Sequence, residues 1–148
     1  MSLFLVLLFM TMSLSLGESS SAGDLFELGN EQYSLGNLAA AKDLYLSAIG
    51  AEDKADFRCN LASVLVDLAE PAQAMESYEA ALEMDGFHPD ALFNYGMLLQ
   101  DEKRTEEAIS MYLRLSSIEP DNCANWSNLG AALHQVGKVP QAVKVRIS

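Results

Sequence analysis

The stretch 89–114 reads PDALFNYGMLLQDEKRTEEAISMYLR, and its pattern decides the fold of the chain. Apolar residues recur at helical spacing in its first half and again in its second half. The charged residues 101–104 separate the two halves. Such a pattern is typical of two amphipathic helices joined by a short turn, so we predict a helical hairpin here.

The same pattern recurs along the chain with a period of 33 or 34 residues. Three series share this period and one phase: the small residues Gly29, Ala62, Gly96 and Gly130, the alanines Ala41, Ala74, Ala108 and Ala142, and the tyrosines Tyr45, Tyr78 and Tyr112. A single helix pair cannot bury its apolar faces, whereas stacked pairs can, so the period predicts a solenoid. We expect the small residues of the first helices to face the alanines of the second helices, with the tyrosines filling the gap to the next pair.

These residues resemble those of the tetratricopeptide repeat (TPR) family over about residues 22–148. The resemblance implies an all-α fold, an α-α superhelix built as a TPR solenoid of antiparallel helix pairs. It implies repeats at about 22–54, 55–88 and 89–122, and a partial repeat at 123–148. Ala69 stands where the second repeat would carry a turn glycine, and Arg146 stands where earlier repeats carry tyrosine.

The partial last repeat ends at Ser148 without a polar capping helix. It would leave an apolar end for a partner, for self-association with a second copy, or for missing sequence. Of these readings, a truncated or alternatively spliced chain is the preferred one.

Residues 1–21 form a separate hydrophobic segment that is signal-like or anchor-like. Residues 3–12 read LFLVLLFMTM, which is too short for a membrane-spanning helix of roughly 20 residues. The length fits a secretory signal, with small residues for cleavage at Ser15 and Gly17 or at Ser20 and Ala22, but no Lys or Arg precedes it. A cleaved signal is favoured over a local hydrophobic start and an uncleaved anchor.

The predicted location follows from that segment. It is the secretory pathway or ER lumen if residues 1–21 are a signal peptide, and the cytoplasm otherwise. In the first case Asn125-Trp126-Ser127 is a glycosylation sequon.

Charge and motifs exclude several function classes. The net charge is −12, and a polyanion repels phosphate backbones, so no nucleic-acid partner is expected. No spacing builds a nucleophile–base pair or a phosphate loop, so we predict no enzyme and no cofactor. Cys59 and Cys123 lie two repeats apart, which predicts two free thiols. His88 and His134 lack ligand spacing and are expected at the surface, so no metal site is predicted.

The resemblance places partner-binding residues on the concave wall formed by the first helices. Asn60, Asn94 and Asn128 step by 34 residues and form an expected polar ladder, because an amide both donates to and accepts from a peptide backbone. Asparagine here is also the common family choice and ties neighbouring helices together, so both readings stay open. The predicted groove residues are Asn30, Asn60, Asp56, Asp67, Asp90, Phe93, Asn94, Met97, Asp101 and Asn128.

The acidic members of this set favour a neutral or basic peptide, anchored on Phe93 and Met97. Chaperone cofactors of the family clamp acidic EEVD tails with Lys and Arg, whereas only Asn30 and Asn60 match that clamp here. The predicted function is a non-catalytic protein-interaction scaffold or adaptor. The alternatives are the TPR portion of a larger enzyme, such as an O-GlcNAc-transferase-like glycosyltransferase, and a luminal co-chaperone for unfolded clients.

Overall fold

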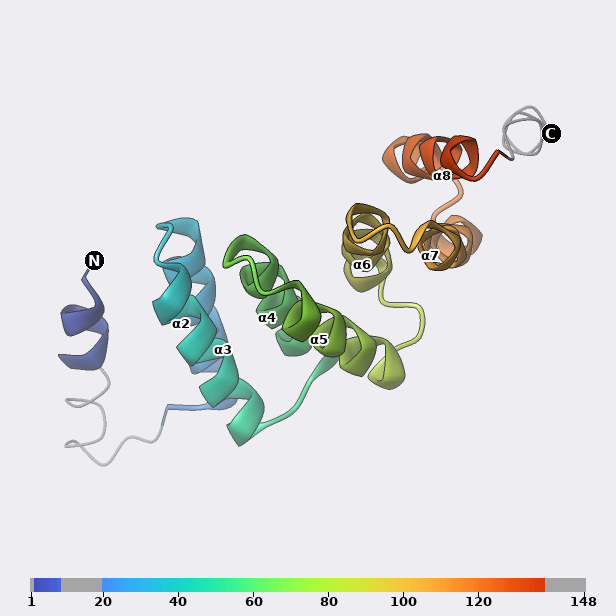
Figure 1. Ribbon diagram of the computed structural model, residues 1–148. Helices are drawn as coiled ribbons and strands as arrows, with labels where there is room; N and C mark the ends of the chain where they lie inside the picture. The colour runs from blue at the N-terminus through green and yellow to red at the C-terminus, as the bar shows by residue number, and fades with distance from the viewer. Residues whose placement is uncertain (1, 9–19, 138–148) are drawn as a thin grey trace. The chain divides into compact units, whose positions relative to one another are not determined.

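The computed structural model describes residues 2–8 and 20–137, and every regular element within them is a helix (Figure 1). Residues 3–8 form one short helix. The others are α2 (Ala22–Ser34), α3 (Leu38–Ala51), α4 (Ala55–Asp67), α5 (Pro71–Met84), α6 (Pro89–Asp101), α7 (Thr105–Ile118) and α8 (Cys123–Gln135). The starts of α2, α4, α6 and α8 are 33, 34 and 34 residues apart, the steps of the small-residue series. The predicted all-α class is confirmed.

The chain divides into two compact units, Met1–Met84 and Asp85–Ser148. In the first unit α2 packs on α3, α3 on α4, and α4 on α5. In the second unit α6 packs on α7, α7 packs on α8, and α6 also touches α8. Each unit is therefore built from helical hairpins that stack on the next helix.

Each hairpin turn places one residue in the left-handed backbone region. The φ values are 79° at Gly36, 60° at Ala69 and 64° at Lys103. The amide of the next residue then closes the helix end, as in Arg104 N–H to Leu99 C=O at 2.8 Å. Only glycine adopts this conformation without steric strain. Ala69 therefore keeps the turn geometry despite lacking the usual glycine, and Lys103 is a second strained position, which the pattern did not reveal.

The glycines of the first helices make room for tyrosine rings. A Cβ added at Gly29 would lie 2.6 Å from Cε1 of Tyr45, and one at Gly96 would collide with the ring of Tyr112. Both tyrosines are buried, and the Tyr112 hydroxyl donates to Gln100 Oε1 at 3.1 Å within its own hairpin. The tyrosine ring therefore packs directly against the glycine within its own hairpin, a contact that the pattern did not reveal. The facing of these small residues with the alanines of the second helices stays a prediction.

The amino-terminal segment contacts the first unit. Val6 is only 2 % exposed and joins a core cluster that includes Leu25 of α2 and Leu44 of α3. Its helical neighbours expose large apolar side chains: Leu3, Phe4, Leu5, Leu7 and Leu8. Among the described residues no helix is long and apolar enough to span a membrane.

The predicted cleavage positions fall at the edge of the described chain. Ser15 and Gly17 lie outside the described residues. Ser21, between the other two small residues, caps α2: its hydroxyl accepts from Asp24 N–H at 3.1 Å, and Asp24 accepts from Ser21 N–H at 3.0 Å. Cleavage after Ala22 would remove this capping box, which stabilises the start of the repeat region.

Candidate functional site

The first unit uses its asparagines to join helices. Asn60 of α4 donates through Nδ2 to Oδ1 of Asn30 on α2 at 2.8 Å. The same oxygen accepts from the Tyr45 hydroxyl, also at 2.8 Å. Asn30 and Asn60 are both half-buried. The structure thus brings these two predicted groove residues together, in the arrangement that ties neighbouring helices.

Asp67 makes a second link between α4 and α2. It accepts a hydrogen bond from the Tyr33 hydroxyl at 2.5 Å. The bond holds the hydroxyl proton, and with partial burial it raises the pKa of Tyr33 to about 12. Among the predicted groove residues of this unit, Asn30, Asn60 and Asp67 are therefore engaged within the protein.

Asp56 lies exposed in the first turn of α4. Arg58, two residues later, forms a bidentate pair with Asp53, at 2.9 Å to Oδ1 and 2.7 Å to Oδ2. This donation lowers the pKa of Asp53 and raises that of Arg58. Arg58 is thus committed to the loop before α4.

In the second unit the equivalent asparagines do not join helices. Asn94 of α6 and Asn128 of α8 are half-buried, and neither side chain hydrogen-bonds to another residue in the part of the chain that the structure describes. Met97 is 39 % exposed on α6, and Phe93 is half-buried on the same helix. Because α6 and α8 are in contact, this unit presents amide groups with unused donors and acceptors beside apolar side chains.

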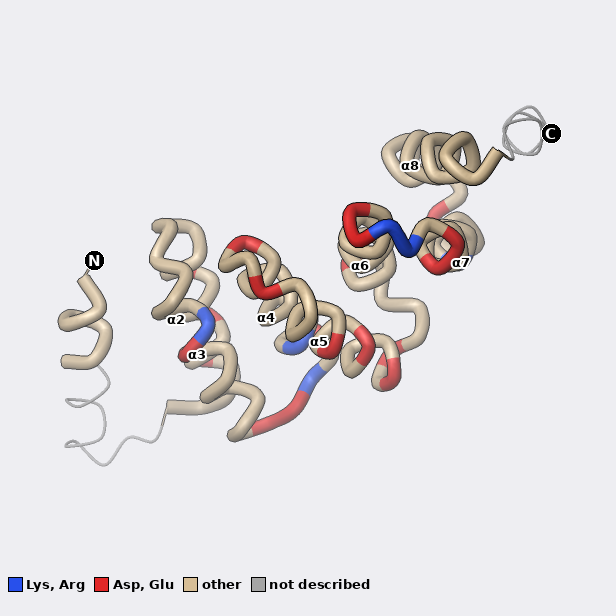
Figure 2. The backbone as a smooth tube through the Cα atoms, in the orientation of Figure 1, with Lys and Arg blue, Asp and Glu red and all other residues tan. Residues whose placement is uncertain are grey.

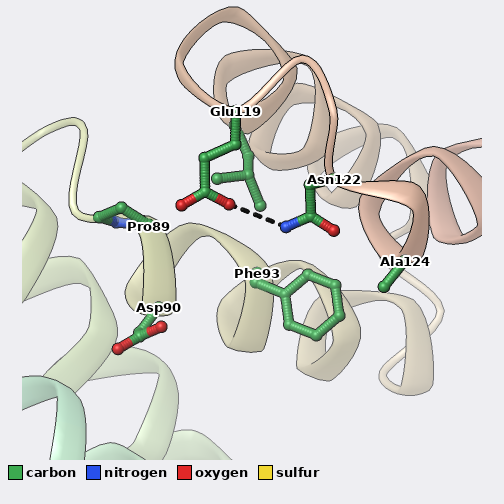
Figure 3. A pocket seen from close by; sticks show the side chains of 7 residues that line it. Pro89, Asp90, Phe93, Glu119, Asn122 and Ala124 are labelled. Atoms are coloured by element: carbon green, nitrogen blue, oxygen red, sulfur yellow. Dashed lines mark hydrogen bonds between the residues drawn. The ribbon is translucent and has the colours of Figure 1, made fainter.

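A pocket of about 180 Å³ opens beside Phe93. Asp90 and Phe93 come from α6, Leu115 from α7, and Glu119 and Asn122 from the loop between α7 and α8. Figure 3 shows the two carboxylates on one side, near Pro89, with the Phe93 ring on the other. Asn122 Nδ2 donates to Glu119 Oε2 at 2.8 Å.

Sequence reasoning found Asp90 and Phe93 but missed Glu119 and Asn122. The available signal was the helix break at Pro120, which locates the loop between α7 and α8. Its proximity to the first turn of α6 depends on packing, so the pattern alone did not connect the two.

Asp101 is exposed at the end of α6, just before the basic turn residues Lys103 and Arg104 (Figure 2). Arg104 forms a bidentate contact with Glu107, with Nε to Oε1 at 2.8 Å and Nη2 to Oε2 at 2.6 Å. That donation lowers the pKa of Glu107. The end of α6 and the turn that follows it therefore carry both acidic and basic side chains.

Two polar residues differ from expectation. His88, expected at the surface, is 8 % exposed and caps α6, accepting from Ala91 N–H at Nδ1 over 3.2 Å. Asn125, the sequon residue, is fully buried, and its Nδ2 donates to the Tyr112 carbonyl at 2.9 Å. The glycosylation atom is therefore inaccessible in the folded second unit.

Cys59 is buried and Cys123 exposed, and neither is in a disulfide, as predicted. No group of three or more His, Cys, Asp and Glu side chains that could hold a metal ion occurs within residues 2–8 and 20–137.

Comparison with known proteins decides the family. A sequence model described as "Tetratricopeptide repeat" matches residues 65–133. The solved structure of YrrB, described as a TPR protein with an unusual peptide-binding site, superposes with a TM-score of 0.73 at 25 % identity. That match covers 85 % of this chain and 66 % of YrrB. This chain belongs to the tetratricopeptide-repeat family. The predicted TPR solenoid class is thereby confirmed, and such repeats typically mediate protein–protein interaction.

Two curated relatives of this TPR chain are longer proteins. The type IV pilus assembly protein PilF of Pseudomonas aeruginosa is 32 % identical over 129 residues, which are 85 % of this chain and 51 % of PilF. The human protein O-mannosyl-transferase TMTC3 is 35 % identical over 95 residues, 61 % of this chain and 10 % of TMTC3. The TPR chain thus spans about half of one relative and a tenth of the other.

Proposed function

We propose that this TPR protein is a non-catalytic interaction module that binds an extended peptide on one face of its second unit. This α6–α8 face carries Phe93, Asn94 and Met97 of α6 and Asn128 of α8. The observation that carries the proposal is the state of Asn94 and Asn128. Both residues are half-buried, and neither side chain hydrogen-bonds within the described residues. Neither amide is among the buried polar groups without a partner, so both remain accessible, and a peptide backbone offers the alternating donors and acceptors that suit an amide.

Neighbouring side chains supply the rest of the surface. Met97 and Phe93 offer apolar contact, and a flexible thioether adapts to different partners. Asp90 and Asp101 make the face acidic, so we expect a neutral or basic peptide to bind better than an acidic EEVD tail.

A charge-graded peptide array tests the proposal. Neutral, basic and EEVD-ended ten-residue peptides would be titrated against the full chain by fluorescence anisotropy. The variant Asn94→Ala plus Asn128→Ala should bind the neutral and basic peptides about tenfold more weakly, the equivalent of one lost hydrogen bond of roughly 1.4 kcal/mol. Its thermal midpoint should stay close to that of the wild type.

The matched control is Ser110→Ala plus Ser117→Ala, two exposed positions on α7. It removes polar groups from the same unit but away from the α6–α8 face, so peptide binding should be unchanged. Equal losses in both variants, or binding of EEVD-ended peptides alone, would contradict the proposed site.

A second candidate is the TPR portion of a larger protein, including an enzyme. The similarity to TMTC3 over 95 residues favours it, because the matched residues are a tenth of that longer protein. A messenger RNA that encodes this chain within a longer glycosyltransferase would establish this reading and make the peptide-binding face a substrate-binding one.

The compartment decides the third candidate, a luminal co-chaperone. Determining the mature amino terminus in cells separates the cases: cleavage near residues 15–22 supports luminal work, and an intact Met1 with cytosolic recovery contradicts it. Self-association through the last helix stays a prediction, since residues 138–148 lie outside the described residues.

A further inference from the structure

The pocket between α6, α7 and α8 has the composition of a binding site for a cationic side chain. Leu115, which is fully buried, contributes to its lining, and Phe93 adds an aromatic wall. Asp90 and Glu119 supply two carboxylates. Among the described residues, no Lys or Arg lines the pocket to supply a counter-charge.

The two carboxylates retain capacity for a ligand. Glu119 accepts one hydrogen bond, from Asn122 at 2.8 Å, and a carboxylate has about four lone-pair sites. Asp90 makes no hydrogen bond or salt bridge to a residue within 20–137. Asp90 is exposed and Glu119 is half-buried, so a bound cation would form partly exposed ion pairs with the two carboxylates.

The pocket size fits one long side chain. Its volume of about 180 Å³ equals roughly six waters at about 30 Å³ each. A guanidinium group suits the lining better than an ammonium, because it is planar, stacks on aromatic rings and bonds carboxylates in a bidentate manner.

An anion is the alternative ligand, since α6 and α8 both begin at the pocket. One amino-terminal amide of each helix is already in use: Ala91 N–H donates to His88 Nδ1, and Asn125 N–H donates to Asn122 Oδ1 at 3.0 Å. With these donors taken and two carboxylates present, the pocket repels an anion.

We infer that this pocket binds an arginine side chain of the partner peptide, with the guanidinium between Asp90 and Glu119 and the aliphatic stem on Phe93. The inference rests on the proposed peptide-binding function of the α6–α8 face and names the residue type that the face selects.

The test uses the full-length chain and two probes that differ only in charge. One is the acetylated and amidated peptide Ser-Ala-Arg-Ala-Ser, and the other carries citrulline, a neutral side chain of nearly the same shape. Amide chemical shifts would be followed by NMR during titration of each. We expect saturable shifts at residues 89–93 and 119–124, with the citrulline peptide about tenfold weaker, as for the loss of two partly exposed ion pairs.

The variant Asp90→Asn plus Glu119→Gln should weaken the arginine peptide about tenfold, to the citrulline level, while keeping the bond from Asn122. The control Glu102→Gln plus Glu106→Gln removes the same number of charges from exposed positions of this unit outside the pocket. It should leave affinity within about twofold, since exposed charges at a distance are screened by salt. Thermal melts establish that both variants fold.

Equal affinity for the two probes, equal loss in the two variants, or no saturable shifts up to about 10 mM peptide would overturn the arginine site. The proposed function fails separately. If longer peptides bind and only the Asn94→Ala, Asn128→Ala variant loses them, the face binds peptide and the arginine assignment is wrong. If no array peptide binds, the peptide-binding function itself is contradicted.

Discussion

Both units carry asparagine at the same repeat position, but the hydrogen bonding of its side chain differs between the two units. In the first unit Asn60 donates to Asn30, which also accepts from Tyr45. In the second unit Asn94 and Asn128 make no such bond to a described residue.

The difference comes from the residue on the neighbouring first helix. Asn60 meets Asn30, thirty residues earlier and able to accept. Asn30 follows the repeat glycine Gly29. In the hairpin before the helix of Asn128, the residue that follows the equivalent Gly96 is Met97, whose thioether is only a weak acceptor. An identical side chain thus joins two helices in one unit and makes no hydrogen bond to a described residue in the other.

The largest change in stability is expected at a feature that both units share, the glycine that packs against a tyrosine ring. Gly96→Val should lower the free energy of unfolding by about 3 kcal/mol, because the fully buried ring of Tyr112 has no room to shift. Gly29→Val should act similarly through Tyr45. Chemical denaturation measures both.

The matched control is Gly50→Ala, on an exposed part of α3 where an added Cβ meets nothing within 4 Å. It should raise stability by about 0.5–1 kcal/mol through helix propensity. Destabilisation there, or tolerance of valine at Gly96, would contradict the packing described for the hairpins.

Asn60 and Asn94 test the comparison most directly. Asn60→Ala should destabilise the chain by about 1–2 kcal/mol, because it removes a part-buried bond between α2 and α4. Asn94→Ala should change stability by less than about 0.5 kcal/mol, as for a substitution that breaks no protein bond. Urea unfolding of each single variant gives the values, and equal losses would remove the distinction between the units.

At a buried glutamine of the first unit, we expect a substitution to raise stability instead of lowering it. Gln32 is fully buried, its Nε2 has no hydrogen-bond partner, and Leu99 occupies the corresponding position of α6. Gln32→Leu should stabilise by about 1 kcal/mol, since relief of the unsatisfied donor outweighs the bond that Asn37 loses. Gln32→Glu serves as the contrasting variant, and it should destabilise by burying a charge.

The smallest effects concern the turns. Lys103→Gly and Ala69→Gly should each stabilise by about 0.5–1 kcal/mol, because glycine adopts positive φ without the steric strain of a Cβ. Thermal melts against Gly36→Ala, which should destabilise by a similar amount, check the sign. A loss of stability in Lys103→Gly would mean that the turn is not left-handed.

Much of the fold was readable from periodicity. The spacing of Ala41, Ala74 and Ala108 predicted residues that are all fully buried. The candidate site was only partly readable. Phe93 and Asp90 were found because they stand on a first helix, whereas Glu119 and Asn122 stand in a loop that no period marks.

The sequence by itself determined the helices, their pairing into hairpins and the burial of their small residues, because these depend on local spacing that repeats every 33 or 34 positions. Only the tertiary structure decided which polar groups are engaged: Asn60 with Asn30, Tyr33 with Asp67, and Asn125 with the Tyr112 backbone. These partners lie 13 to 34 residues apart. A hydrogen bond forms or fails within a few tenths of an ångström, and only the packing of one helix against the next sets distances that finely.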